Sequence, residues 1–217
     1  MTSSELFALL TTCFDAQTTT TATWHLHESA VRDGTIDIPD PALSDTAPSP
    51  NLLQELVIAQ HLRNFQLWHV EDIARRRDVT PGVIADCKYR IDALNQERND
   101  RVERVDACLV ALMTPLLPKH PSASINTESL GMALDRLSIL SLKIWHMDEQ
   151  LHRDNVTPEH LASCQTKLDI LHTQRTDLAD AVVHLVGEFL HGTKTPKLYF
   201  QFKMYNDPTL NPELYGN

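Results

Sequence analysis

The chain has 217 residues, of which 42% are hydrophobic, and 29 acidic against 19 basic residues give it a formal net charge of −10. This length and composition allow one buried core, and the acidic balance argues against a nucleic-acid-binding face, because neutralising phosphates requires a basic surface. The sequence has no run of about 18 apolar residues that would span a membrane and no recognisable signal peptide. We therefore expect a cytoplasmic protein that does not bind nucleic acid.

Residues 1–50 are predicted to form a weak N-terminal helix and a proline-rich loop. The helix is centred on Leu6 to Phe14, and the threonine-rich stretch Thr18 to Thr23 is expected to interrupt it. Gly34 and four prolines between Asp33 and Pro50 then favour a loop.

Residues 51–217 are predicted to form one helical domain that begins with four longer helices. Each helix starts after a residue that can cap it. The predicted helices are Leu52 to about Arg77 after Asn51, 81 to about 113 after Thr80, Thr127 to about Asp154, and 158 to about His191 after Thr157.

The second pair of helices repeats the first at a separation of 77 residues (145 minus 68). Across residues 68 to 111 there are thirteen identities, where chance would give roughly two or three. They include Trp68 and His69 (repeated at Trp145 and His146), Val79-Thr80-Pro81, Cys87, Asp92, Arg98 and Asp100. We infer two copies of one helical hairpin, repeat one over 51–115 and repeat two over 127–191. The predicted all-α fold is an antiparallel four-helix bundle with the N-terminal helix added to it.

The C-terminal tail, residues 194–217, combines five aromatic residues with three prolines. We expect an irregular segment that its aromatic side chains clamp across the bundle. Lys203 and Tyr205 supply a cation and a hydroxyl beside the turn signal that begins at Asn206. The tail could therefore also act as a lid over an anionic ligand, or simply pack on the bundle.

A histidine and an acidic residue stand three positions apart on the first and third helices, as His69 with Asp72 and His146 with Glu149. This spacing lets the two side chains share a hydrogen bond or a metal ion. With Asp92 as a further ligand, the set would suit Mn or Fe. Alternatively, each histidine packs under the neighbouring tryptophan and bonds its acid. A divalent metal is thus possible and the cofactor unknown.

Arg98 and Arg175 interrupt the apolar stripes of the second and fourth helices. A buried arginine must be paired or meet an anion, because an unpaired buried charge is costly. The two guanidinium groups could clamp a phosphate or carboxylate, or pair internally. Asn99 and Asp100 lie beside Arg98 in a polar region, and Glu103-x-x-Asp106 nearby resembles the magnesium-binding motif of all-helical nucleotide pyrophosphohydrolases.

Four strings together resemble a bacterial family of unknown function, DUF4254. They are LWHVEDIARR (67 to 76), RIDALNQERNDRVERVD (90 to 106), DRLSILSLKIWHM (135 to 147) and KMYNDPTLNPELY (203 to 215), and the resemblance covers about residues 51 to 215. Members of that family tend to be associated with lipopolysaccharide and other surface-glycan genes, including glycosyltransferases. The resemblance implies a cytosolic role near nucleotide-sugar or sugar-phosphate metabolism.

Three functional hypotheses follow, and the sequence does not decide whether the protein is an enzyme or a homodimer. The first is an enzyme or binding protein for an anionic sugar phosphate or nucleotide sugar. Its catalytic residues would be His69, Asp72 and Glu103. Its ligand-binding residues would be Arg98, Asn99, Asp100, Arg175, Lys203, Tyr205 and Asn206. The second is a non-catalytic partner of a glycosyltransferase, and the third is a metal-dependent helical-bundle enzyme of the pyrophosphohydrolase or dimetal type.

Overall fold

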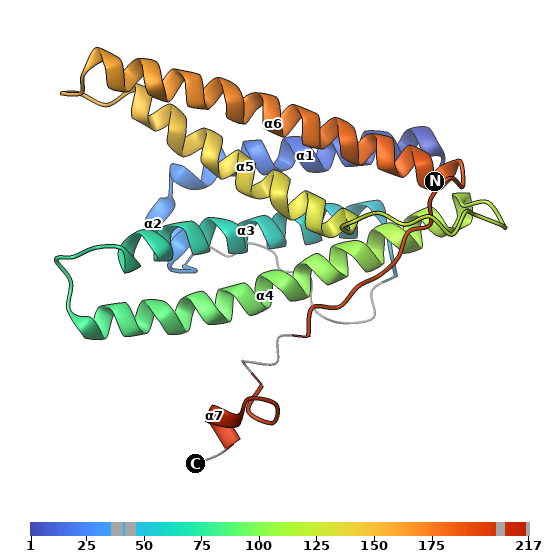
Figure 1. The fold of residues 1–217 in the computed structure, drawn as a ribbon, viewed down its shortest axis with the longest axis horizontal. Coiled ribbons are helices and arrows are strands. Elements are labelled where there is room, and N and C mark those ends of the chain that lie inside the picture. The colour runs from blue at the N-terminus through green and yellow to red at the C-terminus, as the bar shows by residue number, and fades with distance from the viewer. Residues whose placement is uncertain (36–40, 42–46, 203–206, 216–217) are drawn as a thin grey trace.

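The computed structural model describes the chain except for residues 36–40, 42–46, 203–206 and 216–217 (Figure 1). The described residues form seven α-helices and a 3-10 helix, with no strand, so the predicted all-α class is confirmed. None of these helices is both long and apolar enough to cross a membrane. The helices are α1 (Ser3–His25), α2 (Glu28–Arg32), α3 (Pro50–Ala74), α4 (Pro81–Met113), η1 (Thr114–Leu116), α5 (Leu130–Leu151), α6 (Pro158–Leu190) and α7 (Pro212–Tyr215).

Helix α1 is continuous over 23 residues, so the expected interruption by threonines is wrong. It starts with a capping box in which the Thr2 hydroxyl accepts from the Glu5 N–H and the Glu5 carboxylate accepts from the Thr2 N–H. The hydroxyls of Thr20 and Thr23 donate to the carbonyl oxygens four residues earlier. These bonds satisfy the hydroxyl groups inside the helix, so the threonine run continues it.

The four long helices of the two hairpins begin at capped residues. Thr80 and Thr157 accept a hydrogen bond at the start of α4 and α6, each followed by proline, as predicted. Ser49 and Ser129, rather than Asn51 and Thr127, cap α3 and α5. A serine hydroxyl serves the same purpose, because it accepts from a backbone N–H of the first turn.

The helices pack as two antiparallel hairpins, α3 with α4 and α5 with α6, joined where α5 contacts α3 and α4. Helix α1 packs against both α3 and α5 and so lies between the hairpins. Helices α1, α3 and α5 run in one direction and α4 and α6 return, and the hairpins diverge towards their turns (Figure 1). The predicted four-helix bundle with an accessory first helix is not confirmed in that form, because α1 belongs to the core.

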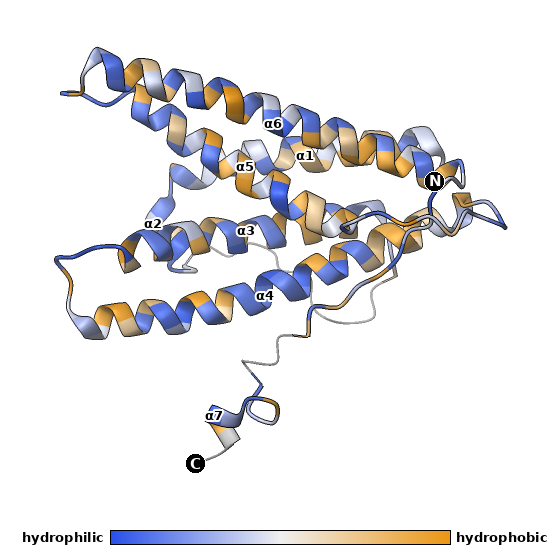
Figure 2. Ribbon diagram, in the orientation of Figure 1, coloured by the Kyte–Doolittle hydropathy of each residue, from blue (hydrophilic) through white to orange (hydrophobic). Residues whose placement is uncertain are grey.

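One cluster of buried apolar side chains joins all five long helices. Leu6, Leu10 and Cys13 of α1 have no solvent-exposed surface, and Phe189 of α6 is also buried. The middle of α4, in contrast, is a hydrophilic stretch (Figure 2). The large core joins one end of the hairpins, and a smaller apolar cluster that includes Trp24, Phe65 and Leu142 packs nearer the turns.

The described part of the tail is held by backbone contacts rather than by its aromatic rings. The Gln201 N–H donates to a Glu103 carboxylate oxygen at 2.8 Å, and the Thr195 N–H donates to the Ser124 carbonyl. Phe200 and Phe202 are 58% and 80% exposed. The predicted aromatic clamp is thus not formed by these residues, and α7 stands apart from the long helices (Figure 1).

Candidate functional site

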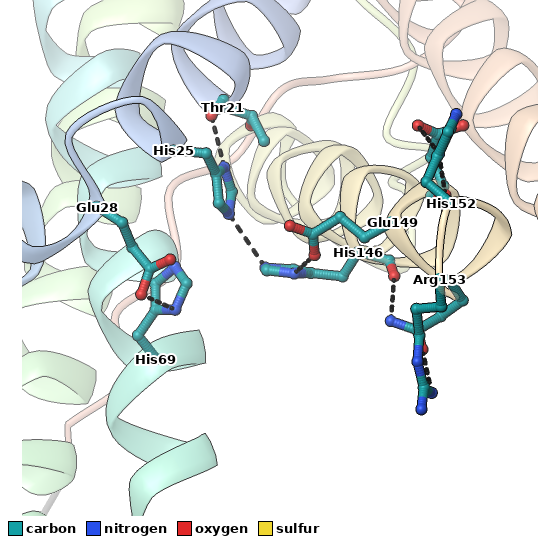
Figure 3. A network of polar contacts seen from close by, with 10 residues as sticks. Thr21, His25, Glu28, His69, His146, Glu149, His152 and Arg153 are labelled. Carbon is teal, nitrogen blue, oxygen red and sulfur yellow. Dashed lines mark hydrogen bonds and ion pairs between the residues drawn. The ribbon is translucent and has the colours of Figure 1, made fainter. Parts of the chain in front are cut away.

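Three imidazole rings from three helices meet at the end of α1 (Figure 3). His25 comes from α1, His69 from α3 and His146 from α5, and their ring centroids are 4.9 to 5.5 Å apart. One ring nitrogen of each histidine lies within 4.8 Å of those of the other two. The packing of α1 between the hairpins creates this cluster, because it brings His25 to the two histidines of the repeats.

The Nδ1 atom of each ring faces an oxygen outside the cluster (Figure 3). His25 Nδ1 is 2.7 Å from the Thr21 carbonyl oxygen, and His146 Nδ1 is 2.7 Å from a Glu149 carboxylate oxygen. His69 Nδ1 is 3.4 Å from a carboxylate oxygen of Glu28 on α2. The predicted histidine–acid pairing is therefore present for His146, whereas His69 pairs with Glu28 instead of Asp72.

Aromatic rings surround the histidine cluster. Trp68 stacks on His146 with 4.5 Å between centroids and 6° between planes, and Trp145 stacks on His25. Burial first, and then the neighbouring His146 and His25, lower the pKa of His69 to about 4. Burial also lowers the pKa of His25, against the opposing effect of its bond to Thr21. His69 is thus neutral at pH 7.

A polar cavity of about 480 Å³ lies beside the cluster between α3, α4 and α5. The Arg98 Nε atom is buried at this cavity and has no hydrogen-bond partner among the described residues, and Asp135 is 3.9 Å away. Burial raises the pKa of Asp135, and the Arg98 charge opposes that rise. The cavity is lined by Asn64, Leu67, Trp68, Glu71, Asp72, Arg75, Asn95, Arg98, Ile139 and Leu142.

Two further cavities continue the first one along α5 and α6. The second, of about 650 Å³, shares Trp68 and Asp72 with the first and is also lined by His146, Lys143 and Lys167. The third, of about 590 Å³, shares Lys143 with the second. Because neighbouring cavities have wall residues in common, we call the three together the polar trough.

A buried chain of hydrogen bonds lies under the trough and was not predicted. His61, fully buried, bonds through Nδ1 to the Ser138 hydroxyl at 2.6 Å and through Nε2 to the Thr21 hydroxyl at 2.9 Å. The Asn64 amide donates to the Ser138 hydroxyl and to the Asp135 carboxylate. These hydrogen bonds connect Asn64, in the wall of the first cavity, with Thr21 in the turn of α1 that holds His25.

The structure brings only part of the predicted site together. His69 and His146 adjoin, Glu149 bonds His146, Asp72 lies at the boundary of two cavities, and Arg98 lines the first. The remaining predicted residues lie elsewhere: Asp92 pairs with Lys88, Asp100 accepts from Gln96, Glu103 accepts from the tail, and Asn99 is buried in α4. Lys203, Tyr205 and Asn206 lie outside the described residues.

Arg175 does not join Arg98 in a common clamp. Its Nε donates to the Ser141 hydroxyl at 3.0 Å and its terminal nitrogen to the Phe14 carbonyl oxygen at 2.7 Å. The prediction of two arginines around one anion is therefore wrong in this form. The reason is α1, which lies between the hairpins and offers Arg175 a backbone acceptor.

His25, Glu28 and Lys167 were not among the site residues predicted from the sequence. His25 and Glu28 precede the repeats, and a search for chemistry restricted to repeated positions passes over them. A helical reading of α1 through its threonines would have exposed the signal, since it aligns Thr21 and His25 one turn apart.

The fold and the site define an all-helical protein with a three-histidine cluster beside a polar trough. The chain matches the family described as a protein of unknown function, DUF4254, over residues 54–198, and it belongs to that family. Neither the curated proteins nor the solved structures include a match to it. His69, His146 and the residues that line the trough fall within the matched range, whereas His25 and Glu28 precede it.

Proposed function

We propose that this protein binds an anionic small molecule of the sugar-phosphate or nucleotide-sugar type in the polar trough, as an enzyme or ligand-binding protein of bacterial surface-glycan metabolism in the cytoplasm. The observation that carries the proposal is the second cavity. Lys143 and Lys167 line it together with the indole of Trp68, in a chain whose net charge is −10. Ammonium groups bind phosphate, and an indole face packs against a sugar or base ring.

The first cavity supplies a further cationic group for such a ligand. Arg98 presents a guanidinium whose Nε lacks a hydrogen-bond partner within the described chain. A ligand oxygen that accepted this hydrogen would satisfy a buried donor, which is worth more than an exposed contact. A molecule that spans both cavities would pass Trp68 and Asp72, which line each of them.

Asp72 is the best placed group for acid and base chemistry on that ligand. Its side chain is 59% exposed at the boundary of the first two cavities, so it can reach a bound molecule. His69 is too deeply buried to play this role, and Glu103 is engaged by the tail.

The surface-glycan setting rests on the resemblance of four sequence strings to a family associated with lipopolysaccharide genes.

The two hairpins further support a duplication, because residues 77 positions apart face each other. His61 bonds Ser138 and the rings of His69 and His146 adjoin, as an approximate twofold axis between α3 and α5 would require.

Calorimetric titration with UDP-glucose, glucose 1-phosphate and inorganic phosphate tests the proposal. We expect UDP-glucose or glucose 1-phosphate to bind, and the double variant Lys143→Met/Lys167→Met to bind at least about tenfold more weakly, because two phosphate contacts are lost. The control is Lys119→Met, which replaces an exposed lysine that does not line the trough. This variant should bind the ligand like the wild type. Equal affinity of the double variant, or no binding of any probe, would refute the proposal.

A second function, as a non-catalytic partner of a glycosyltransferase, is favoured by the exposed aromatic side chains of the tail. Phe200 and Phe202 pack against each other with 6.0 Å between centroids and remain largely exposed. Exposed aromatic residues are common anchors at protein interfaces. A Phe200→Ser/Phe202→Ser variant should then lose binding to a purified glycosyltransferase that the wild type binds, while still binding sugar phosphate. Light scattering of the wild type and of this double variant would show whether the tail forms a homodimer instead.

A further inference from the structure

We propose that His25, His69 and His146 bind one divalent transition-metal ion of the zinc class through their Nε2 atoms. The three rings come from α1, α3 and α5, and one nitrogen of each lies within 4.8 Å of the other two (Figure 3). This site differs from the dimetal set expected from the sequence, because it adds His25, leaves out Asp72 and Asp92, and keeps Glu149 only as the partner of His146 Nδ1. It also goes beyond the proposed function, since Lys143, Lys167 and Arg98 take no part in it.

The partners of the rings determine where their protons are. The Thr21 carbonyl and the Glu28 and Glu149 carboxylates can only accept hydrogen bonds, so the proton of each neutral ring belongs on Nδ1. The Nε2 atom of each ring then carries a lone pair. An outer oxygen acceptor at Nδ1 is the arrangement that orients histidines which bind metals.

While all three rings are neutral with the proton on Nδ1, these lone pairs have no donor among one another. His25 Nε2 and His146 Nε2 are 3.3 Å apart, so two acceptors face each other. His69 Nε2 is buried and has no hydrogen-bond partner among the described residues, and its side chain is only 8% exposed. A buried polar atom of this kind requires an explanation, and an ion shared by the three rings provides one.

The distances suit a tetrahedral ion. A Zn–N bond is about 2.0–2.1 Å long, so two nitrogens on one tetrahedral zinc ion are about 3.4 Å apart. The His25–His146 separation of 3.3 Å already agrees with that value. The His69 nitrogen lies within 4.8 Å of the nitrogens of His25 and His146. A rotation of the His69 ring would shorten these distances towards the value for one shared ion.

Imidazole ligands select ions of the zinc and copper group rather than magnesium or calcium, which prefer oxygen. Three protein ligands leave a fourth position for water or substrate, as in catalytic zinc sites. His146 also lines the second cavity, so that position is next to the polar trough. A bound ion would act there as a Lewis acid on an anionic ligand.

Titration of the chelator-treated full chain with Zn²⁺ and Co²⁺ tests the site. We expect one ion per chain and a visible absorption band from bound Co²⁺. The variants His25→Gln, His69→Gln and His146→Gln should each lose affinity by about 100-fold or more, since a ligand is removed. The matched control His152→Gln removes an exposed histidine of the same region, whose side chain is 74% exposed, and should bind like the wild type.

Binding of less than about a tenth of an ion per chain would overturn the proposal, as would wild-type affinity in His25→Gln. If circular dichroism shows that a histidine variant does not fold, Glu149→Gln provides the test. Its side chain is 47% exposed, and loss of the outer carboxylate should weaken binding about 10–100-fold. Unchanged affinity in that variant would contradict the site. The Lys143→Met/Lys167→Met variant should bind the metal normally, so failure of the anion proposal can be recognised separately.

Discussion

Asp106 on α4 accepts a hydrogen bond from the backbone N–H of Gly131 in the first turn of α5, with 2.7 Å between the two atoms. This bond joins the two hairpins where α5 begins, and the carboxylate lies near the positive end of that helix. Burial raises the pKa of Asp106, and hydrogen bonds from Ser129 and Gly131 oppose the rise. The backbones approach so closely that a β-carbon at residue 131 would lie 2.5 Å from the Val102 carbonyl oxygen.

Gly131→Ala should therefore lower the free energy of unfolding by about 1–3 kcal/mol, although alanine normally favours a helix, because the α4 backbone cannot move aside. The matched variant is Gly187→Ala on α6, where an added β-carbon would meet no described atom within 4 Å. That change should raise the free energy of unfolding by about 0.5–1 kcal/mol. Urea unfolding followed by circular dichroism measures both. A shift in the same direction for the two variants would contradict the close approach.

The buried His61 predicts a loss of stability in mild acid. Burial first, and then the charge of Arg175, lower its pKa from 6.5 to about 3 in the folded chain. Between these values the unfolded chain binds a proton that the folded chain does not. The titration of His61 therefore leaves the free energy of unfolding unchanged above pH 6.5. Below pH 6.5 it lowers this free energy by about 1.4 kcal/mol per pH unit as the pH decreases towards 3.

The variant His61→Gln lacks this titration and isolates the effect. The free energy of unfolding of this variant at pH 7 should lie below that of the wild type, because a glutamine side chain cannot make both hydrogen bonds, to Thr21 and to Ser138, as well as the imidazole does. The difference between the two proteins should then shrink from pH 7 to pH 5. A constant difference across this range would mean that residue 61 does not titrate as its burial implies.

Arg175 and Arg98 should respond to substitution in opposite ways. Arg175→Met removes the hydrogen bonds to Ser141 and to the Phe14 carbonyl, so it should destabilise the fold by about 1–3 kcal/mol and leave ligand affinity unchanged. Arg98→Met should weaken sugar-phosphate binding, because Arg98 lines the trough. Thermal unfolding and calorimetry on the two variants distinguish these roles. Equal effects on affinity would place Arg175 back in the site.

The helices were largely predictable from the sequence because their signals are local. Thr80 and Thr157, each followed by proline, mark the starts of α4 and α6, and apolar spacing marks the buried faces. The place of α1 was not predictable in this way. Its threonine run looks unfavourable to a helix until Thr20 and Thr23 are seen to bond back to the preceding turn.

The candidate site was predicted only where it lies within the repeats. The sequence places His69 and His146 in one possible ligand set and offers Glu149 as a partner of His146, and the structure brings these residues together. His25 and Glu28 reach the same place through the tertiary packing of α1 and α2, for which spacing along α3 gives no signal. On α4, Asp92 pairs with Lys88, and Glu103 accepts a hydrogen bond from Gln201 of the tail. The sequence alone does not show which of several possible partners each acid takes.

The packing of α1 also has a consequence for how the chain assembles. The Gln17 side-chain amide of α1 donates to the Leu134 carbonyl oxygen of α5, 117 residues further along the chain. Each hairpin closes through neighbouring residues and can form early, whereas a pairing of such long range is slow. Helix α1 precedes both hairpins in the chain and packs against α3 and α5, so during translation its contact surface for α5 stays uncovered until the second hairpin has been made.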